Sequence, residues 1–219
     1  IKNYDEDKFM AGIPFDTPEM SEGLISPIKS VEQCWRTMKL YFNLDRKIAR
    51  LILLQRNELT SPSLKKIRKL FGRYIFTNFF TKFMISPKSF SFKYYELMLK
   101  EYDFLIKHIN FDNKKILSIG AGMCGLEIII NSKSINNYFT IIEKDYVSKK
   151  VAYGWDSKNK EAYNSIDLLN FFLINNGMKK ENFEIYNFDK DKFPITKYEY
   201  IISLYSLDYH YDFFNYFEY

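Results

Sequence analysis

The sequence predicts an α/β fold in which a helical extension precedes a parallel sheet. Two observations indicate this fold. Four short apolar runs alternate with helix-like segments in the second half of the chain, as in sheets whose parallel strands are joined by helices. In the first half, apolar residues recur at helical spacing from Val31 to about Ile109. At 219 residues the chain is long enough for one such domain with an extension, but short for two full domains.

The extension divides into an arm and a basic helical region. Residues 1–28 contain three of the six prolines and little periodicity, so we expect an extended arm. Residues 29–110 are predicted to hold three or four helices, with natural starts at Ser61-Pro62 and Ser86-Pro87, because proline suits a first helical turn. Residues 29–100 carry 16 Lys or Arg against 4 Asp or Glu, a net charge of +12. Such a region can face phosphates, nucleic acid or an anionic membrane surface, or form a solvated face.

Residues 111–219 are predicted to form the sheet domain. The apolar runs that we expect to be its strands are, in order, Lys115–Ile119, Phe139–Glu143, Phe183–Phe188 and Tyr200–Leu204. A helix from about Tyr163 to Asn176 is expected to end at Gly177, a common C-terminal cap. The sequence ends soon after the fourth strand, so we expect a sheet that is either truncated or unusually small.

The first strand leads into the most informative motif of the chain. Gly120, Gly122 and Gly125 follow it in a GxGxxG pattern, and the next strand ends on Glu143, 23 residues after Gly120. Rossmann-like folds hold a ribose with this arrangement, because the glycines let the backbone approach the ligand and the carboxylate accepts the ribose hydroxyls. We therefore predict that the chain binds a nucleotide cofactor.

Three classes of cofactor-binding protein fit this motif. An NAD-dependent dehydrogenase fits the three glycines and Glu143. A flavoprotein that binds FAD also fits, because Ala121 lies between two of the glycines and Lys144 follows the acid, although that class usually begins its chain with this strand. The third class uses S-adenosylmethionine as a methyl donor, and it explains more of the chain.

The segments that favour the third class lie between about residues 114 and 212. Beyond the glycine turn they are Tyr163-Asn164-Ser165, Asn176-Gly177 and the run from Ile202 to Tyr211, in which a serine-rich strand leads to a histidine flanked by tyrosines. In these segments the chain resembles Rossmann-like class I S-adenosylmethionine-dependent methyltransferases, and bacterial sugar O-methyltransferases in particular. Two positions depart from the family pattern: Ser118 stands where many members carry an acid, and Cys124 stands where they often have glycine.

The resemblance implies a cofactor site and a catalytic pair. The glycine turn would contact S-adenosylmethionine, Glu143 would bind its ribose, and Asp189 would lie on the adenine side. The full set implied at the cofactor site is Gly120, Ala121, Gly122, Gly125, Glu143, Lys144, Phe188, Asp189 and Ser203. His210 is the candidate general base for an acceptor hydroxyl, because it follows the carboxyl end of the fourth strand, where open α/β sheets place ligands. Asp208 would orient His210 or act in its place.

The composition bears on the cellular compartment, on metal binding and on membrane insertion. Cys34 and Cys124 form no metal-binding spacing and indicate a reducing compartment. His108 and His210 are the only histidines, so we predict no metal site. No apolar stretch approaches the roughly 18 residues of a membrane span, so we predict no transmembrane segment and a cytoplasmic protein.

These observations together predict an S-adenosylmethionine-dependent O-methyltransferase that acts on a hydroxyl of a sugar or glycan precursor. The basic helices would form a lid, or a surface for an anionic acceptor such as a nucleotide-linked sugar. The alternatives are an RNA methyltransferase whose basic region contacts phosphates, an oxidoreductase that binds NAD or FAD, and a cofactor-binding module without catalysis.

Overall fold

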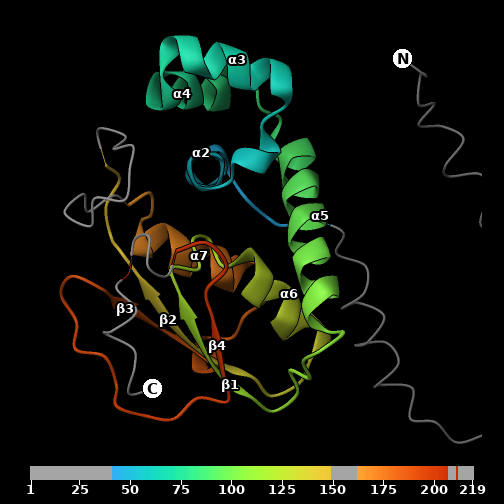
Figure 1. The fold of residues 1–219 in the computed structure, drawn as a ribbon, viewed down its shortest axis with the longest axis vertical. Helices are drawn as coiled ribbons and strands as arrows, with labels where there is room; N and C mark the ends of the chain where they lie inside the picture. Colours follow the sequence, from blue (N-terminus) through green and yellow to red (C-terminus); the bar gives the residue numbers. More distant parts are fainter. Residues whose placement is uncertain (1–40, 149–161, 207–210, 212–219) are drawn as a thin grey trace, which may run out of the picture. The chain divides into compact units, whose positions relative to one another are not determined.

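Four parallel strands form the centre of the structure. The computed structural model describes residues 41–148, 162–206 and 211, and its sheet has the strand order β3-β2-β1-β4 (Figure 1). The strands are β1 (Lys115–Ile119), β2 (Tyr138–Glu143), β3 (Phe183–Asn187) and β4 (Tyr200–Ile202). Three of them lie within the predicted runs and β2 begins one residue earlier than predicted, so the α/β class and the parallel sheet are confirmed.

Helices account for most of the remaining described residues. The α-helices are α2 (Arg46–Gln55), α3 (Pro62–Phe71), α4 (Arg73–Phe83), α5 (Pro87–Leu105), α6 (Gly125–Lys133) and α7 (Ile166–Asn175), and the short 3-10 helices are η2 (Asn57–Leu59) and η3 (Lys180–Asn182). Both predicted Ser-Pro starts are confirmed, since α3 and α5 begin at their prolines. The predicted arm, residues 1–28, lies outside the described residues.

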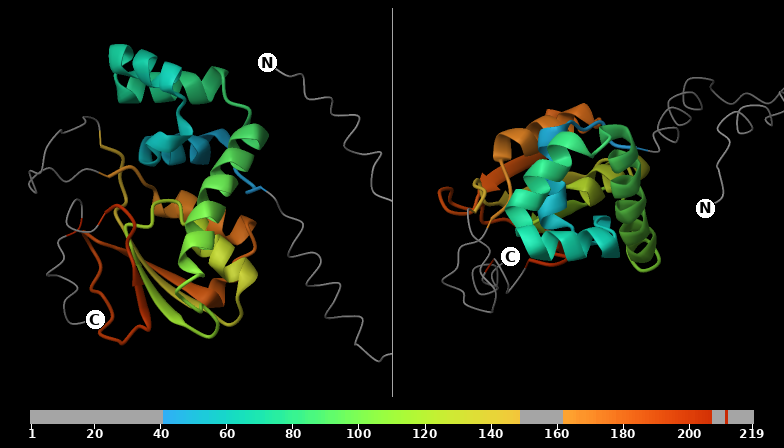
Figure 2. Two further views of the ribbon diagram at one scale, coloured as in Figure 1. Left: turned by 45° about the vertical axis from the view of Figure 1, so that its right-hand side comes forward. Right: turned by 90° about the horizontal axis from the view of Figure 1, so that it is seen from above.

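One face of the sheet carries the main hydrophobic core. Side chains alternate between the two faces of a strand, so Ile116 of β1 and Ile141 of β2 point toward the helices. There they join buried residues of α2, α5, α6 and α7, of which Leu53, Met98, Ile129 and Phe172 are examples. Figure 2 shows these helices gathered on the same side of the sheet in two further views. This layer holds α2 and α5 close to the end of the sheet where the glycine turn lies.

The opposite face of the sheet has a smaller cluster. Leu117, Ile119 and Ile142 pack there against Tyr211 and against aromatic side chains that follow β3, including Phe188. Within the described residues, loop side chains rather than helices contribute to this cluster. The arrangement brings Tyr211 from far along the chain to the ends of β1 and β2.

The helix predicted from about Tyr163 begins three residues later than expected. α7 starts at Ile166, and Tyr163 instead forms an isolated antiparallel bridge with Val147. The side chain of Asn164 is also used elsewhere, because its Oδ1 accepts a hydrogen bond from the backbone of Ser165 at 2.9 Å while its amide reaches the glycine turn. A local hydrogen bond of this kind competes with helix formation.

Candidate functional site

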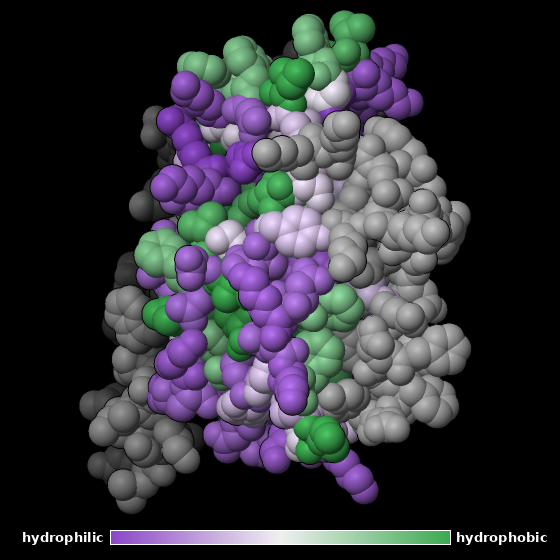
Figure 3. All heavy atoms as spheres, turned by 90° about the vertical axis from the view of Figure 1, so that its left-hand side faces the viewer, coloured by the Kyte–Doolittle hydropathy of each residue, from purple (hydrophilic) through white to green (hydrophobic). Residues whose placement is uncertain are grey.

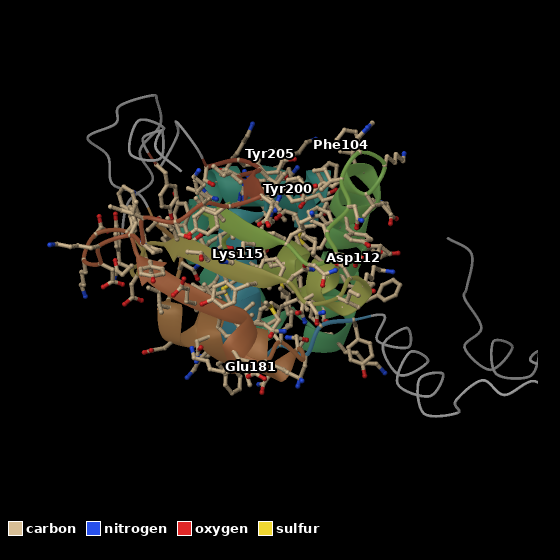
Figure 4. The ribbon with its side chains drawn as sticks, turned by 90° about the horizontal axis from the view of Figure 1, so that it is seen from below. Phe104, Asp112, Lys115, Glu181, Tyr200 and Tyr205 are labelled. Atoms are coloured by element: carbon tan, nitrogen blue, oxygen red, sulfur yellow. The ribbon has the colours of Figure 1, made fainter. Side chains whose placement is uncertain are left out.

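A cavity opens at the carboxyl ends of the central strands. Its volume is about 440 Å³, and its wall includes the turn after β1, the last residue of β2 and the segment after β4. Open α/β sheets bind ligands at this edge. Figure 4 labels Lys115 at the opposite end of β1 and Tyr205 on the segment beyond β4. The lining is Gln55, Arg56, Asn57, Glu58, Arg73, Met98, Ile119, Gly120, Ala121, Gly122, Leu126, Glu127, Glu143, Ala162, Tyr163, Asn164, Ile202, Ser203, Leu204, Tyr205, Ser206 and Tyr211.

The glycine turn requires its glycines for two reasons. Gly120 and Gly122 have φ values of +60° and +64°, and residues that carry a Cβ adopt this backbone conformation only at an energetic cost. A Cβ on Gly120 would also lie 2.3 Å from the Oγ of Ser206, and one on Gly122 would lie 2.6 Å from the Oε1 of Gln55. The Ser206 hydroxyl donates to the Ile119 or Gly120 carbonyl at 2.9 or 3.0 Å, so it packs directly on the turn.

Glu143 is a buried carboxylate whose two oxygens both accept hydrogen bonds. Oε1 accepts from the backbone N–H of Gly122 at 2.6 Å. Oε2 accepts from the Tyr211 hydroxyl at 3.0 Å and from the Lys144 N–H at 3.1 Å. Burial raises the pKa of Glu143, and these donors oppose that rise because they stabilise the charged form. The predicted acid at the end of the second strand therefore lies against the glycine turn, inside the cavity wall.

Two amide side chains connect elements around the glycine turn. Asn164 donates from Nδ2 to the Gly122 carbonyl at 2.7 Å. Gln55, the last residue of α2, donates from Nε2 to the Tyr163 carbonyl at 2.8 Å. The glycine turn, α2 and the segment before α7 are thus joined around one side of the cavity. Asn164 belongs to one of the segments that resemble the methyltransferase family, whereas Gln55 was not predicted from the sequence.

Two arginines line the cavity from the helical layer, and their environments differ. Arg56 forms a two-fold ion pair with Glu101 of α5, at 2.8 and 3.2 Å. Arg73, the first residue of α4, donates to the Leu54 carbonyl and, at 3.4 Å, to the Tyr163 hydroxyl. Its guanidinium carbon lies 4.6 Å from the centre of the Tyr163 ring. No carboxylate among the described residues pairs with Arg73, so its charge is available to an anionic ligand group.

Glu127 is a second buried carboxyl in the cavity wall. It lies in the first turn of α6 and is 3% exposed. Burial raises its pKa from 4.5 to about 7. A carboxyl that titrates near neutrality in a cavity is typical of functional sites. An acid in the first turn of an apolar helix is the sequence signal that could have identified it.

Cys124 shows the cost of one departure from the family pattern. It precedes α6 in a left-handed conformation, with φ +54° and ψ +34°, where a glycine would be unstrained. Its side chain is buried, and burial raises the pKa of the thiol well above its ordinary value. The thiol is therefore held in its neutral, unreactive form.

The predicted cofactor residues fall into two groups. Gly120, Ala121, Gly122, Glu143 and Ser203 line the cavity. The others are Gly125, Lys144, Phe188 and Asp189, and they are absent from its described lining.

The four residues of the second group lie in other environments of the fold. Gly125 packs closely beneath α5, where a Cβ would meet Tyr94 at 2.6 Å. The Nζ of Lys144 lies 5.3 Å from the ring centre of Phe188, whose ring meets that of Tyr211 edge to face at 5.0 Å. Asp189 is exposed. Tyr211, whose hydroxyl donates to Glu143, therefore packs its ring against both Phe188 and Lys144.

His210 and Asp208, the predicted catalytic pair, lie outside the described residues. Among the residues described, no group of three or more His, Cys, Asp or Glu side chains could hold a metal ion. None of the helices in the same ranges is both long and apolar enough to span a bilayer.

Comparison with protein-family models, curated proteins and solved structures found no match to this chain.

Proposed function

We propose that the chain is an S-adenosylmethionine-dependent methyltransferase that methylates a hydroxyl of a sugar or glycan precursor in the cytoplasm. One observation carries the proposal. A glycine turn with positive φ values after β1 and a buried carboxylate at the end of β2 meet in the wall of one cavity, joined by the 2.6 Å hydrogen bond from Gly122 to Glu143. This pairing is suited to the nucleoside part of a cofactor.

The residues present fit such a nucleoside. Glu143 already accepts a hydroxyl, that of Tyr211, at Oε2, and ribose hydroxyls are donors of the same kind. A ligand that enters would compete with Tyr211 for this oxygen. The cavity volume of about 440 Å³ lies within the roughly 300–1,000 Å³ typical of small-molecule sites.

The chain's own part in the reaction is to orient the acceptor and remove its proton. S-adenosylmethionine, when bound, supplies an electrophilic methyl group on a sulfonium. Transfer to an alcohol needs the hydroxyl in line with that carbon and a base within hydrogen-bond reach. His210, with Asp208, remains our candidate for the base. Arg73, charged and unpaired with any described carboxylate, is the residue that we expect to bind an anionic group on the acceptor.

Thermal melting with different ligands tests the proposal. We expect S-adenosylhomocysteine to raise the melting temperature of the full chain, because a ligand that binds only the folded state stabilises it. NAD and FAD serve as parallel controls and should leave the melting temperature unchanged. Stabilisation by NAD or FAD alone would replace the proposal with a redox function. A cooperative melt that no ligand shifts would favour a module that does not bind these cofactors.

An acceptor screen follows a positive result. Nucleotide sugars come first, since Arg73 favours an anionic acceptor. Formation of S-adenosylhomocysteine that depends on the acceptor would establish methyl transfer. Cofactor binding without turnover on any acceptor would favour a non-catalytic module.

A further inference from the structure

The α3–α4 pair, residues 62–83, has apolar side chains that the other described residues leave exposed. α3 contains no buried residue, although the helix is strongly amphipathic. Leu70 is 80% exposed and Ile75 is 67% exposed. Figure 3 shows hydrophobic side chains at the top of the molecule, where this pair lies, beside strongly hydrophilic ones. The other large exposed side chains of the pair and its C-terminal cap are Ile67, Phe71, Phe79, Phe83 and Met84.

The exposure follows a regular pattern on α4. Phe76 is buried and stacks on Phe80, with ring centres 5.3 Å apart. Ile75, Phe79 and Phe83 recur at four-residue spacing and form a second stripe, which is exposed. One stripe therefore secures the helix to the protein, and the other faces solvent. An exposed apolar surface of this extent marks an interaction site.

Charge identifies the partner. Between Glu58 and Glu96 the sequence contains no acidic residue and eight basic ones: Lys65, Lys66, Arg68, Lys69, Arg73, Lys82, Lys88 and Lys93. Exposed Leu, Ile and Phe side chains beside lysines are suited to the boundary between anionic headgroups and acyl chains. Nucleic acid would satisfy the charge but offers no apolar layer for Leu70 and Ile75.

We propose that the α3–α4 pair docks on an anionic membrane surface. Its lysines lie at the headgroups, and Leu70, Ile75 and Phe79 enter the headgroup–acyl boundary. Because α4 begins at Arg73, which lines the cavity, the docked surface borders the site. The proposal does not depend on the proposed reaction, and vesicle binding is measured without cofactor or acceptor.

Vesicle cosedimentation of the full chain tests the proposal. The vesicles are phosphatidylcholine alone, or two parts phosphatidylcholine to one part phosphatidylglycerol. We expect binding to the mixed vesicles, weak binding to the neutral ones, and loss of binding as sodium chloride is raised, because salt screens the lysines.

Two double variants separate charge from apolar insertion. Lys66→Gln with Lys69→Gln should weaken binding to mixed vesicles about thirty-fold, since each lysine near an anionic surface contributes about 1 kcal/mol. Leu70→Ser with Ile75→Ser should weaken it about ten-fold or more, because both side chains lose apolar burial. These positions are exposed, so the variants should fold, and thermal melting verifies that they do.

Matched substitutions elsewhere on the surface serve as controls. Lys179→Gln with Lys190→Gln removes the same charge, and Ile135→Ser with Ile195→Ser removes similar exposed apolar area. Both should leave vesicle binding unchanged.

Three results would overturn the proposal. The full chain could fail to bind mixed vesicles, bind neutral and mixed vesicles equally, or bind mixed vesicles with no difference between the α3–α4 variants and their controls. RNA binding that the lysine variant abolishes, with no vesicle binding, would assign the surface to nucleic acid instead.

Discussion

Replacing Glu127 with glutamine should remove a pH-dependent cost from the folded state. Burial raises the pKa of Glu127 from 4.5 to about 7, so between these values the folded state holds a proton that the unfolded state releases. Its carboxyl therefore costs nothing below pH 4.5, and the stability of the protein falls as pH rises through 7. The difference between these two pKa values corresponds to about 3 kcal/mol in the free energy of unfolding.

The charged groups around Glu127 are few. Arg56, at the end of α2, lowers its pKa, and Glu101 of α5 raises it. Burial also raises the pKa values of Tyr94 and Cys124, so both stay neutral over this pH range. Glutamine keeps the shape of the side chain and has no charge to desolvate. We expect Glu127→Gln to stabilise the protein by about 2–3 kcal/mol near pH 8 and to have little effect near pH 5.

Urea unfolding of the variant and the unsubstituted protein across this pH range measures the difference. Comparing the two chains removes the contribution of Glu143, because its raised pKa is common to both. Glu181→Gln, at an exposed carboxyl on η3, is the matched control and should change stability little at any pH. A difference that does not vary with pH, or a variant that is less stable near pH 8, would show that Glu127 carries no such cost in the folded state.

Three further substitutions test the geometry of the turn. Gly120→Ala should lower the free energy of unfolding by about 2–4 kcal/mol, as measured in urea. Alanine is unfavourable at this left-handed φ, and its Cβ would also collide with Ser206 and Tyr211. A loss below about 1 kcal/mol would contradict the close packing. Cys124→Gly should be less destabilising than Cys124→Ala by about 1 kcal/mol, since only glycine relieves the left-handed conformation, and the reverse order would contradict that account. Tyr211→Phe removes a hydroxyl donor from Glu143 and should cost about 1–2 kcal/mol at alkaline pH and less as the pH falls, because the carboxyl becomes protonated. A cost that does not vary with pH would argue against the hydrogen bond.

The sheet could be predicted because its signals are local. Each strand is a short apolar run. The turn after β1 is indicated by glycines, which are needed where φ is positive or where another group approaches the backbone closely. The same locality explains why Glu143 was found, since an acid at a strand end needs no knowledge of the tertiary structure. Its partner Gly122 is 21 residues away, yet the motif already relates the two.

Long-range contacts account for what the sequence did not predict. Arg73 reaches the cavity only because α4 packs on α2, and no periodicity encodes that placement. The start predicted for α7 was wrong because Asn164 forms a tertiary hydrogen bond with Gly122, 42 residues away. Lys144 and Phe188 follow family positions, but the ring of Tyr211 lies against both, which only the folded chain reveals.

Calorimetric titration with S-adenosylhomocysteine, on the unsubstituted protein and on Glu143→Gln, measures whether Glu143 binds the nucleoside of the cofactor. We expect saturable binding that weakens about ten- to a hundred-fold in the variant, because ribose hydroxyls lose a charged acceptor. Glu184→Gln, which alters a partly buried carboxylate bonded to Thr140 away from the cavity, should bind as the unsubstituted protein does. Absence of binding to the unsubstituted protein, or equal affinity in Glu143→Gln, would contradict the account.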